Sequence, residues 1–287
     1  MTAVAHPPRP LRLGCVRYLN TLPLIEGLEK AADLDLVPAA PARLIDLLLA
    51  RDVDAALVSI IDAQRSPEPL TLIPSGMIGC DGATLTVRLY SAVPLDRIAA
   101  RAADADSHTA ITLCRVLLAR RFGVSPRVAD FAAPADAVGA ASAEWPEAAL
   151  LIGDKVVTAA PPPARYPHTL DLGEAWKNWT GLPFVYAAWA CRAEDAASPR
   201  TRLIRDVLDR QRRHNATRLD WIVARRAPQR GWPTGLAAGY VGDLLRYDPG
   251  EAGSPFRAAV ERFFDEAHAL GLTPRRAPVR WLDDPGA

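Results

Sequence analysis

The sequence predicts an α/β fold, on the basis of two observations. Short apolar runs alternate along the chain with segments whose apolar residues have helical spacing, an order typical of α/β proteins. Of the 287 residues, 49% are hydrophobic and 23% are charged, as in ordinary globular proteins. The length is sufficient for one or two domains with a substantial core.

The first third of the chain predicts three strands and two helices. Strands are expected at residues 11–16, 34–38 and 53–60, the last apolar enough to be buried on both faces. Between them we expect a helix over residues 22–30 and a second helix opening at Pro41, whose apolar face would be Leu44, Ile45, Leu48 and Leu49.

The middle of the chain predicts three further strands. Residues 83–93 alternate between apolar and polar side chains, which indicates a long strand whose polar face carries Thr84, Thr86 and Arg88. Apolar runs at 148–152 and 184–191 predict the other two strands.

From about residue 198 the pattern is mostly helical. Ser198-Pro199 and Ser254-Pro255 each combine an N-cap residue with proline at the first helical position. Gly271 closes the last helix, whose core face is expected to be Ala259, Phe263, Ala267 and Leu270.

The two long strands, at 83–93 and 184–191, are candidate crossing points between two lobes. Residues 94–183 would then form one lobe, and residues 1–93 together with 184–287 would form the other, with a ligand cleft between them.

Composition excludes several classes of function. The 34 Lys and Arg nearly cancel the 33 Asp and Glu, giving a formal charge of +1, so no affinity for nucleic acid or a membrane surface is expected. The longest aliphatic run, residues 44–50, is far shorter than the ~20 residues of a membrane helix. Residues 1–10 do not resemble a signal peptide, and a cytoplasmic location is therefore expected.

Common catalytic and metal-binding motifs are absent from the sequence. It contains no P-loop, G-x-G-x-x-G, H-E-x-x-H or G-x-S-x-G pattern, and its five histidines lack metal-ligand spacing. The cysteines are scattered and are expected to be buried, reduced thiols: Cys15, Cys80, Cys114 and Cys191.

Candidate ligand-binding residues lie at the junctions between strands and helices. Asn20 and Thr21 follow the first strand, at the edge where open α/β sheets bind ligands. Ser107 is a natural N-cap for a helix that begins with His108, Thr109 and Ala110, and a helix start receives anions well.

Three more junctions complete the set. They are Gly82 with Thr84 and Thr86, then Asp154 after an apolar strand, and then Thr180-Gly181 before Phe184. Each junction by itself fits a simple helix cap, strand edge or tight turn equally well.

Taken in order, these segments resemble the chorismate dehydratase family of the futalosine route to menaquinone. The resemblance covers nearly the whole chain from about residue 11. It is carried by V-R-Y-L-N-T-L-P-L at 16–24, V-D-A-A-L-V-S at 53–59, G-x-x-x-T-V-x-L-Y-S at 82–91, S-H-T at 107–109, L-I-G-D at 151–154, D-L-G-x-x-W at 171–176, T-G-L-P-F-V-Y-A-x-W-A at 180–190 and Y-V-G-D-L-L-R-Y at 240–247.

The resemblance implies a two-lobed periplasmic-binding-protein type 2-like fold with hinge strands and a central cleft. It implies removal of water from chorismate to give 3-[(1-carboxyvinyl)oxy]benzoate, without cofactor or metal, by a monomer or homodimer. Asn20 would be the catalytic residue. The substrate-binding residues would be Tyr18, Thr21, Ser59, Gly82, Thr84, Thr86, Ser107, His108, Thr109, Ala110, Asp154, Thr180, Gly181 and Phe184.

The chain departs from the family pattern at two places. Thr86 stands where the family usually has Ser, and Ser107-His108-Thr109-Ala110 stands where it has S-x-T-S. The S-P-C-P-N-D-T opening of the related naphthoate synthase is absent. A non-catalytic cytoplasmic binding protein or sensor for a small carboxylate is the alternative function, because a fold alone does not determine an activity.

Overall fold

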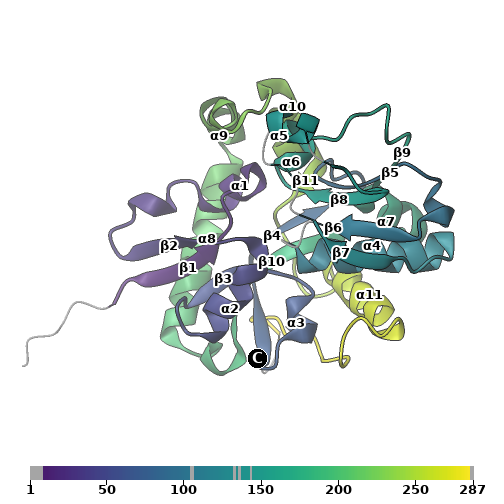
Figure 1. Cartoon of the computed structure of the whole chain (residues 1–287). Coiled ribbons are helices and arrows are strands. Elements are labelled where there is room, and N and C mark those ends of the chain that lie inside the picture. Colours follow the sequence, from purple (N-terminus) through teal and green to yellow (C-terminus); the bar gives the residue numbers. More distant parts are fainter. Residues whose placement is uncertain (1–8, 104–106, 132–133, 135–136, 143, 285–287) are drawn as a thin grey trace, which may run out of the picture.

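The protein folds into two α/β lobes, each built around its own sheet (Figure 1). The structure is a computed structural model and describes residues 9–103, 107–131, 134, 137–142 and 144–284. The two-lobed α/β architecture predicted above is therefore confirmed.

The first lobe contains a six-stranded sheet in the order β11-β4-β10-β3-β1-β2. Its strands are β1 (Leu11–Cys15), β2 (Leu34–Pro38), β3 (Ala55–Ser59), β4 (Leu70–Cys80), β10 (Phe184–Arg192) and β11 (Leu245–Arg246). β1 pairs in parallel with β2 and β3, whereas β10 pairs antiparallel with β3 and β4. The predicted strands at 11–16, 34–38, 53–60 and 184–191 are all present, and β4 is an addition that the sequence pattern did not reveal.

Helices cover both faces of this sheet. α8 (Pro199–Ala216) packs against β4 and α1 (Leu22–Ile25), and α2 (Leu44–Leu49) packs against β3. The single helix predicted over residues 22–30 is wrong: α1 ends early, and a separate 3-10 turn, η2 (Leu28–Lys30), follows it. The reason is Gly27, whose left-handed backbone (φ +97°) interrupts the helix.

The second lobe contains a five-stranded sheet in the order β7-β6-β8-β5-β9. Its strands are β5 (Val87–Ser91), β6 (Ala100–Ala103), β7 (Arg127–Asp130), β8 (Ala148–Ile152) and β9 (His168–Asp171), and its helices are α4 (His108–Phe122), α5 (Ala137–Ser142), α6 (Lys155–Thr158) and α7 (Leu172–Thr180).

The chain enters the second lobe earlier than expected. β5 pairs with β8 and β9, so the sheets place the crossing at residues 81–86, before the boundary at residue 93 expected from the sequence. The predicted strand at 83–93 is correspondingly shorter. Thr84 and Thr86, expected on its polar face, precede β5 and are buried.

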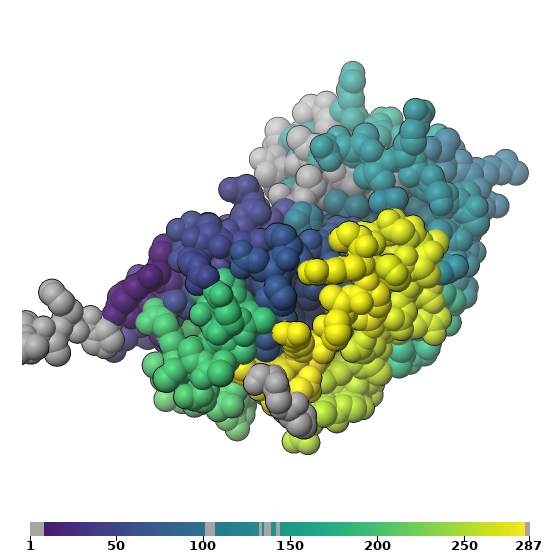
Figure 2. Space-filling view, turned by 90° about the horizontal axis from the view of Figure 1, so that it is seen from below, coloured from purple at the N-terminus to yellow at the C-terminus, as the bar shows by residue number. Residues whose placement is uncertain are grey.

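The C-terminal third is helical, as predicted, and contacts both lobes. It comprises α9 (Leu219–Arg226), α10 (Thr234–Gly239), the π-helical turn η7 (Tyr240–Leu244) and α11 (Pro255–Ala269). α11 packs against both β10 and α4, while Arg280 accepts a hydrogen bond from Leu72 of β4 at 2.8 Å. Figure 2 shows α11 and the chain that follows it, in yellow, across the underside of the molecule.

The helix caps follow the predicted pattern. The Ser198 and Ser254 side chains accept hydrogen bonds from the backbone N–H groups of Thr201 and Arg257. Gly271, just after α11, has the left-handed backbone expected there (φ +66°).

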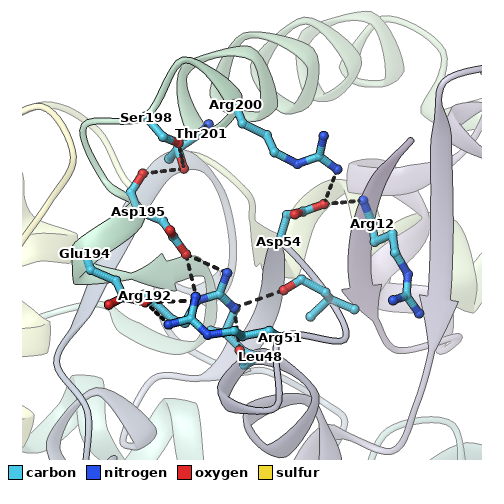
Figure 3. Close-up of polar contacts among 11 residues, drawn as sticks. Arg12, Leu48, Arg51, Asp54, Arg192, Glu194, Asp195, Ser198, Arg200 and Thr201 are labelled. Atoms are coloured by element: carbon cyan, nitrogen blue, oxygen red, sulfur yellow. Dashed lines mark hydrogen bonds and ion pairs between the residues drawn. The ribbon is translucent and has the colours of Figure 1, made fainter. Parts of the chain in front are cut away.

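A network of hydrogen bonds and ion pairs lies at the amino-terminal ends of β1 and β3 in the first sheet (Figure 3). Asp54, just before β3, accepts hydrogen bonds from the Arg12 backbone at 2.7 Å and the Arg200 guanidinium at 2.6 Å. The buried Arg192 donates to the carbonyls of Leu48 and Val53 at 2.6 and 3.2 Å. These charges are paired at the edge opposite the carboxyl ends of β1 and β3.

Two further expectations about the chain can be compared with the structure. All four cysteines are buried, as predicted, and none of them forms a disulfide. Within the described part of the chain, no helix is both long and apolar enough to cross a membrane.

Candidate functional site

A cavity lies between the two lobes, at the carboxyl ends of β1 and β3. Its empty volume, which includes space open to solvent, is about 590 Å³. Both lobes and the C-terminal segment line it, with these residues: Val16, Tyr18, Asn20, Pro41, Leu57, Ser59, Ile78, Thr84, Thr86, Val87, Ser107, Ile152, Gly153, Tyr186, Ala187, Tyr240 and Leu245.

The cavity is lined mainly by apolar surface, and the polar side chains in it are uncharged. Hydroxyl groups and one carboxamide supply its polar side chains, and none of the described residues that line it is Asp, Glu, Lys, Arg or His. A ligand held here would be recognised by neutral hydrogen-bond donors and acceptors, backed by apolar side chains of both lobes.

The crossing segment 81–86 presents two of these hydroxyls. The Thr86 N–H donates to the Thr84 carbonyl at 2.7 Å, forming a three-residue turn around Leu85. Leu85 has a φ of +63°, a strained conformation for a residue with a side chain. Thr84 and Thr86 flank this turn, and both line the cavity.

The carboxylate of Asp171 holds the turn in place. It accepts hydrogen bonds from the Thr84 N–H at 3.0 Å and the Leu85 N–H at 2.7 Å. The same side chain caps α7 by accepting from Gly173 and Glu174 at 3.1 and 3.2 Å. One buried carboxylate therefore joins the first turn of α7 to the crossing segment.

Gly173 allows α7 to approach this segment closely. A Cβ at this position would lie 2.6 Å from both the Cys80 sulfur and the Gly82 carbonyl oxygen, so a larger residue would displace the segment. In the middle of α7, the Trp176 indole donates to the Pro183 carbonyl at 2.9 Å. Contacts made by residues 171–184 thus stabilise both segments that connect the lobes.

A chain of polar side chains joins Asn20 to Thr86. The Thr86 Oγ1 lies 2.5 Å from the Tyr240 hydroxyl, and the Asn20 side chain interacts with the same hydroxyl. Thr21 Oγ1 donates to Asn20 Oδ1 at 3.1 Å. Burial raises the pKa of Tyr240 well above its ordinary value, so this hydroxyl stays protonated.

The amino terminus of α4 contributes Ser107. Its side chain accepts a hydrogen bond from Ala110 N–H at 3.2 Å, as predicted for an N-cap, and it lines the cavity. His108 and Thr109 instead face the first lobe: His108 Nδ1 lies 2.7 Å from Asp62 Oδ1, and Thr109 Oγ1 accepts from the Ile61 N–H at 3.3 Å.

Asp154 connects the lobes beside the cavity. Its carboxylate accepts a hydrogen bond from the Leu19 N–H at 3.4 Å, and burial raises its pKa. The preceding Gly153 lies against the Tyr18 ring, which would be 3.2 Å from a Cβ at that position. Asp154 thus fixes the relative position of the lobes and does not itself line the cavity.

The residues predicted from the sequence fall into two groups. Six line the cavity: Tyr18, Asn20, Ser59, Thr84, Thr86 and Ser107. The others do not line it: Thr21, Gly82, His108, Thr109, Ala110, Asp154, Thr180, Gly181 and Phe184.

Three members of the second group have structural contacts of their own. Thr180 Oγ1 donates to the Trp176 carbonyl at 2.9 Å, and Gly181 ends α7 with a φ of +73°. The Phe184 ring packs in the core, 5.0 Å from Phe263 between ring centroids. Their roles in substrate binding stay predictions.

Sequence reasoning missed two tyrosines of the cavity. Tyr186 lies on β10 and Tyr240 on η7, and both are buried. Each belongs to a segment that carried the family resemblance, but only the fold brings Tyr240 next to Thr86, 154 positions away in the chain.

Solved structures share the fold over nearly the whole chain. The alkanesulfonate-binding protein SsuA of Xanthomonas axonopodis pv. citri, bound to MOPS, is 15% identical with a TM-score of 0.66, covering 96% of this chain and 98% of its own. The periplasmic aliphatic sulphonate binding protein SsuA of Escherichia coli is 16% identical with a TM-score of 0.62, covering 94% and 96%. The predicted periplasmic-binding-protein fold is thereby confirmed.

Sequence comparison identifies the family. The chorismate dehydratase of Thermus thermophilus is 30% identical over 278 residues, which span 92% of this chain and 96% of that protein. The family model for menaquinone biosynthesis matches residues 11–269. The chain therefore belongs to the menaquinone biosynthesis family.

Proposed function

We propose that the protein is a chorismate dehydratase, a hydro-lyase that converts chorismate into 3-[(1-carboxyvinyl)oxy]benzoate. The named relative supports this assignment. The observation that carries it in the structure is the uncharged cavity between the lobes, in which Asn20, Thr86 and Ser107 meet. A cytoplasmic location is part of the proposal, and four cysteines that form no disulfide fit a reducing compartment.

The reaction requires little from the protein beyond binding and orientation. The C3–H and C4–O bonds of the substrate ring break, a C3–C4 double bond forms, and the hydroxyl leaves as water. The ring becomes aromatic, which supplies the driving force. Catalysis then depends on holding the substrate in one pose, stabilising charge that spreads toward the ring carboxylate, and excluding bulk water.

Neutral donors are suited to the two carboxylates of chorismate. In our proposal Ser107 and the first backbone N–H groups of α4 hold one carboxylate, because a helix start offers free donors and a partial positive charge. Thr84 and Thr86, in the crossing segment, would also donate hydrogen bonds to the substrate.

Asn20 is assigned to the reacting centre, beside the departing hydroxyl. The described residues that line the cavity include no Asp, Glu or His, so the base in this proposal is the substrate's own enolpyruvyl carboxylate. The C3 proton passes to that carboxylate and from it to the departing hydroxyl, which leaves as water, so that the carboxylate is regenerated.

The test is incubation of the purified protein with chorismate, followed by chromatography of the aromatic product. We expect enzyme-dependent formation of 3-[(1-carboxyvinyl)oxy]benzoate, and a loss of about 10²-fold in kcat for Asn20→Ala. Asn178→Ala, which changes an exposed asparagine of α7, is the matched control and should retain full activity.

Two outcomes would contradict the proposal at different levels. Saturable chorismate binding without product would identify a binding protein or sensor and not a dehydratase. Full turnover by Asn20→Ala with wild-type affinity would leave the dehydratase in place but remove Asn20 from the reacting centre.

A further inference from the structure

We propose that Tyr240 is a positioning residue of this site, whose hydroxyl orients the Thr86 hydroxyl as a hydrogen-bond donor toward the bound substrate. The inference rests on the proposed dehydratase function and extends it to a residue of the C-terminal segment.

The Tyr240 ring is held rigidly. It is 1% exposed and stacks on Trp232, with ring centroids 4.9 Å apart and planes inclined by 13°. It also begins the π-helical turn η7, an irregularity found frequently at functional sites. Its hydroxyl therefore reaches Thr86 from a fixed direction, at 2.5 Å.

The hydrogen bonds around Asn20 give this chain a direction. Thr21 donates to Asn20 Oδ1, so the end of the Asn20 amide left for the Tyr240 hydroxyl is its NH₂ group. We therefore assign the Tyr240 hydroxyl as the donor, and Thr86 Oγ1 as the acceptor, in the contact between them. Thr86 then has its hydroxyl proton free for an acceptor in the cavity.

The backbone of Thr86 is fixed as well. Its N–H is bound to the Thr84 carbonyl, and its own carbonyl accepts from the Gly153 N–H at 2.9 Å. Burial keeps Tyr240 protonated, because it raises the pKa of the phenol. The side-chain proton of Thr86 is thus oriented before the substrate binds.

Such orientation matters in a cavity without charged side chains. Donors that already point at a developing negative charge need no reorganisation during the reaction, and aligned hydrogen bonds strengthen one another. Without the Tyr240 hydroxyl, Thr86 could turn its proton toward other acceptors, and the transition state would lose more stabilisation than the bound substrate.

Tyr240→Phe tests the proposal, because it removes one oxygen and retains the stacked ring. We expect kcat for chorismate to fall about tenfold, while KM changes less than about threefold. The matched control is Tyr247→Phe. Tyr247 is half-buried, its buried hydroxyl oxygen has no hydrogen-bond partner among the described residues, and it does not line the cavity, so this variant should have wild-type kcat.

A double-mutant cycle shows whether Tyr240 acts through Thr86. If it does, Tyr240→Phe in a Thr86→Ala background should change kcat less than about twofold, because the interaction has already been removed. Independent effects that multiply in the double variant would overturn the proposal, as would a Tyr240→Phe variant with wild-type kcat.

The outcomes separate this inference from the function on which it rests. If the wild-type protein forms no product from chorismate, the proposed function fails and the inference fails with it. If the wild type turns over chorismate and Tyr240→Phe behaves like Tyr247→Phe, only the role of Tyr240 is wrong.

Discussion

Leu85 has an unusual backbone conformation for its residue type, and its neighbours explain why it persists. A left-handed φ of +63° costs a residue with a side chain about 1–2 kcal/mol. The hydrogen bonds from Thr84 and Leu85 to Asp171 stabilise the turn that contains it. Strain at such positions is characteristic of functional sites, and here it places two hydroxyls on one side of the cavity.

Asp171→Asn should loosen this turn while leaving the cap of α7 in place. One oxygen of the asparagine can still accept from Gly173 and Thr84, but the NH₂ group replaces the oxygen that accepts from Leu85. We expect a loss of about 1–3 kcal/mol in unfolding free energy and at least about a tenfold loss in kcat/KM for chorismate. Urea unfolding and steady-state kinetics measure the two effects.

Ser254→Ala is the matched control for Asp171→Asn. It removes the side-chain cap of α11, far along the chain from the crossing segment, and should cost about 1 kcal/mol. Its kcat/KM should equal that of the wild type. An Asp171→Asn variant with lowered stability but undiminished kcat/KM would show that Asp171 has no positioning role.

At the scale of elements, α7 determines where the crossing segment lies. Its first turn approaches residues 80–82 so closely that only glycine fits at position 173. Its indole bond to Pro183 fixes the second crossing between the lobes. The helix therefore links both connections, although α7 contributes no side chain to the lining of the cavity.

Gly173→Ala and Gly235→Ala should change stability in opposite directions. The new Cβ at 173 would lie 2.6 Å from Cys80 and Gly82, and overpacking of this kind costs about 1–3 kcal/mol. At 235, in α10, a Cβ meets nothing within 4 Å, so alanine should add about 0.5–1 kcal/mol through its helix propensity. Urea unfolding of both variants checks this, and a Gly173→Ala variant as stable as wild type would contradict it.

Local sequence patterns predicted most elements but missed β4. Parallel strands such as β3 are continuous apolar runs, and the serine caps of α8 and α11 are strong local signals. β4 contains Pro74, Gly76 and Gly79, which weaken a strand pattern. It pairs with β10 through register shifts that no local pattern encodes.

The candidate site shows the same division between local and long-range information. Asn20 and Ser107 were found because each lies at the start of a helical segment, where backbone rules apply. Tyr240 carries no such local signal: its place beside Thr86 depends on how the C-terminal segment folds back over both lobes.

At the scale of the whole molecule, the lobes meet along two sets of contacts. Beside the cavity, Asp154 bonds to the Leu19 backbone. Between α3 (Asp62–Arg65) and α4, Arg65 donates to Thr112 at 2.8 Å, and His108 pairs with Asp62 at 2.7 Å. His108 stands at the variable position of the family's S-x-T-S pattern, and its partner Asp62 lies across the boundary between the lobes.

This pair should make stability depend on pH. The hydrogen bond to buried Asp62 raises the pKa of His108, and the negative charges of Asp62 and Asp46 raise it further. The burial of His108 and the positive charge of Arg65 lower this pKa, but the net shift is upward. A histidine whose pKa is higher in the folded state than its unfolded value of about 6.5 stabilises the fold below that value. The contribution is lost as the pH rises through the folded-state pKa.

We therefore expect His108→Gln to lower the melting temperature more at pH 6.0 than at pH 9.0. The reason is that only the protonated imidazole carries a positive charge that balances the negative charge of the buried Asp62 carboxylate. His214→Gln, which changes an exposed histidine of α8, should have an equally small effect at both pH values. Thermal unfolding by circular dichroism measures the four differences from wild type. An equal loss for His108→Gln at both pH values would mean that this contact joins the lobes as a neutral hydrogen bond, so that pH would not alter how tightly α3 holds α4.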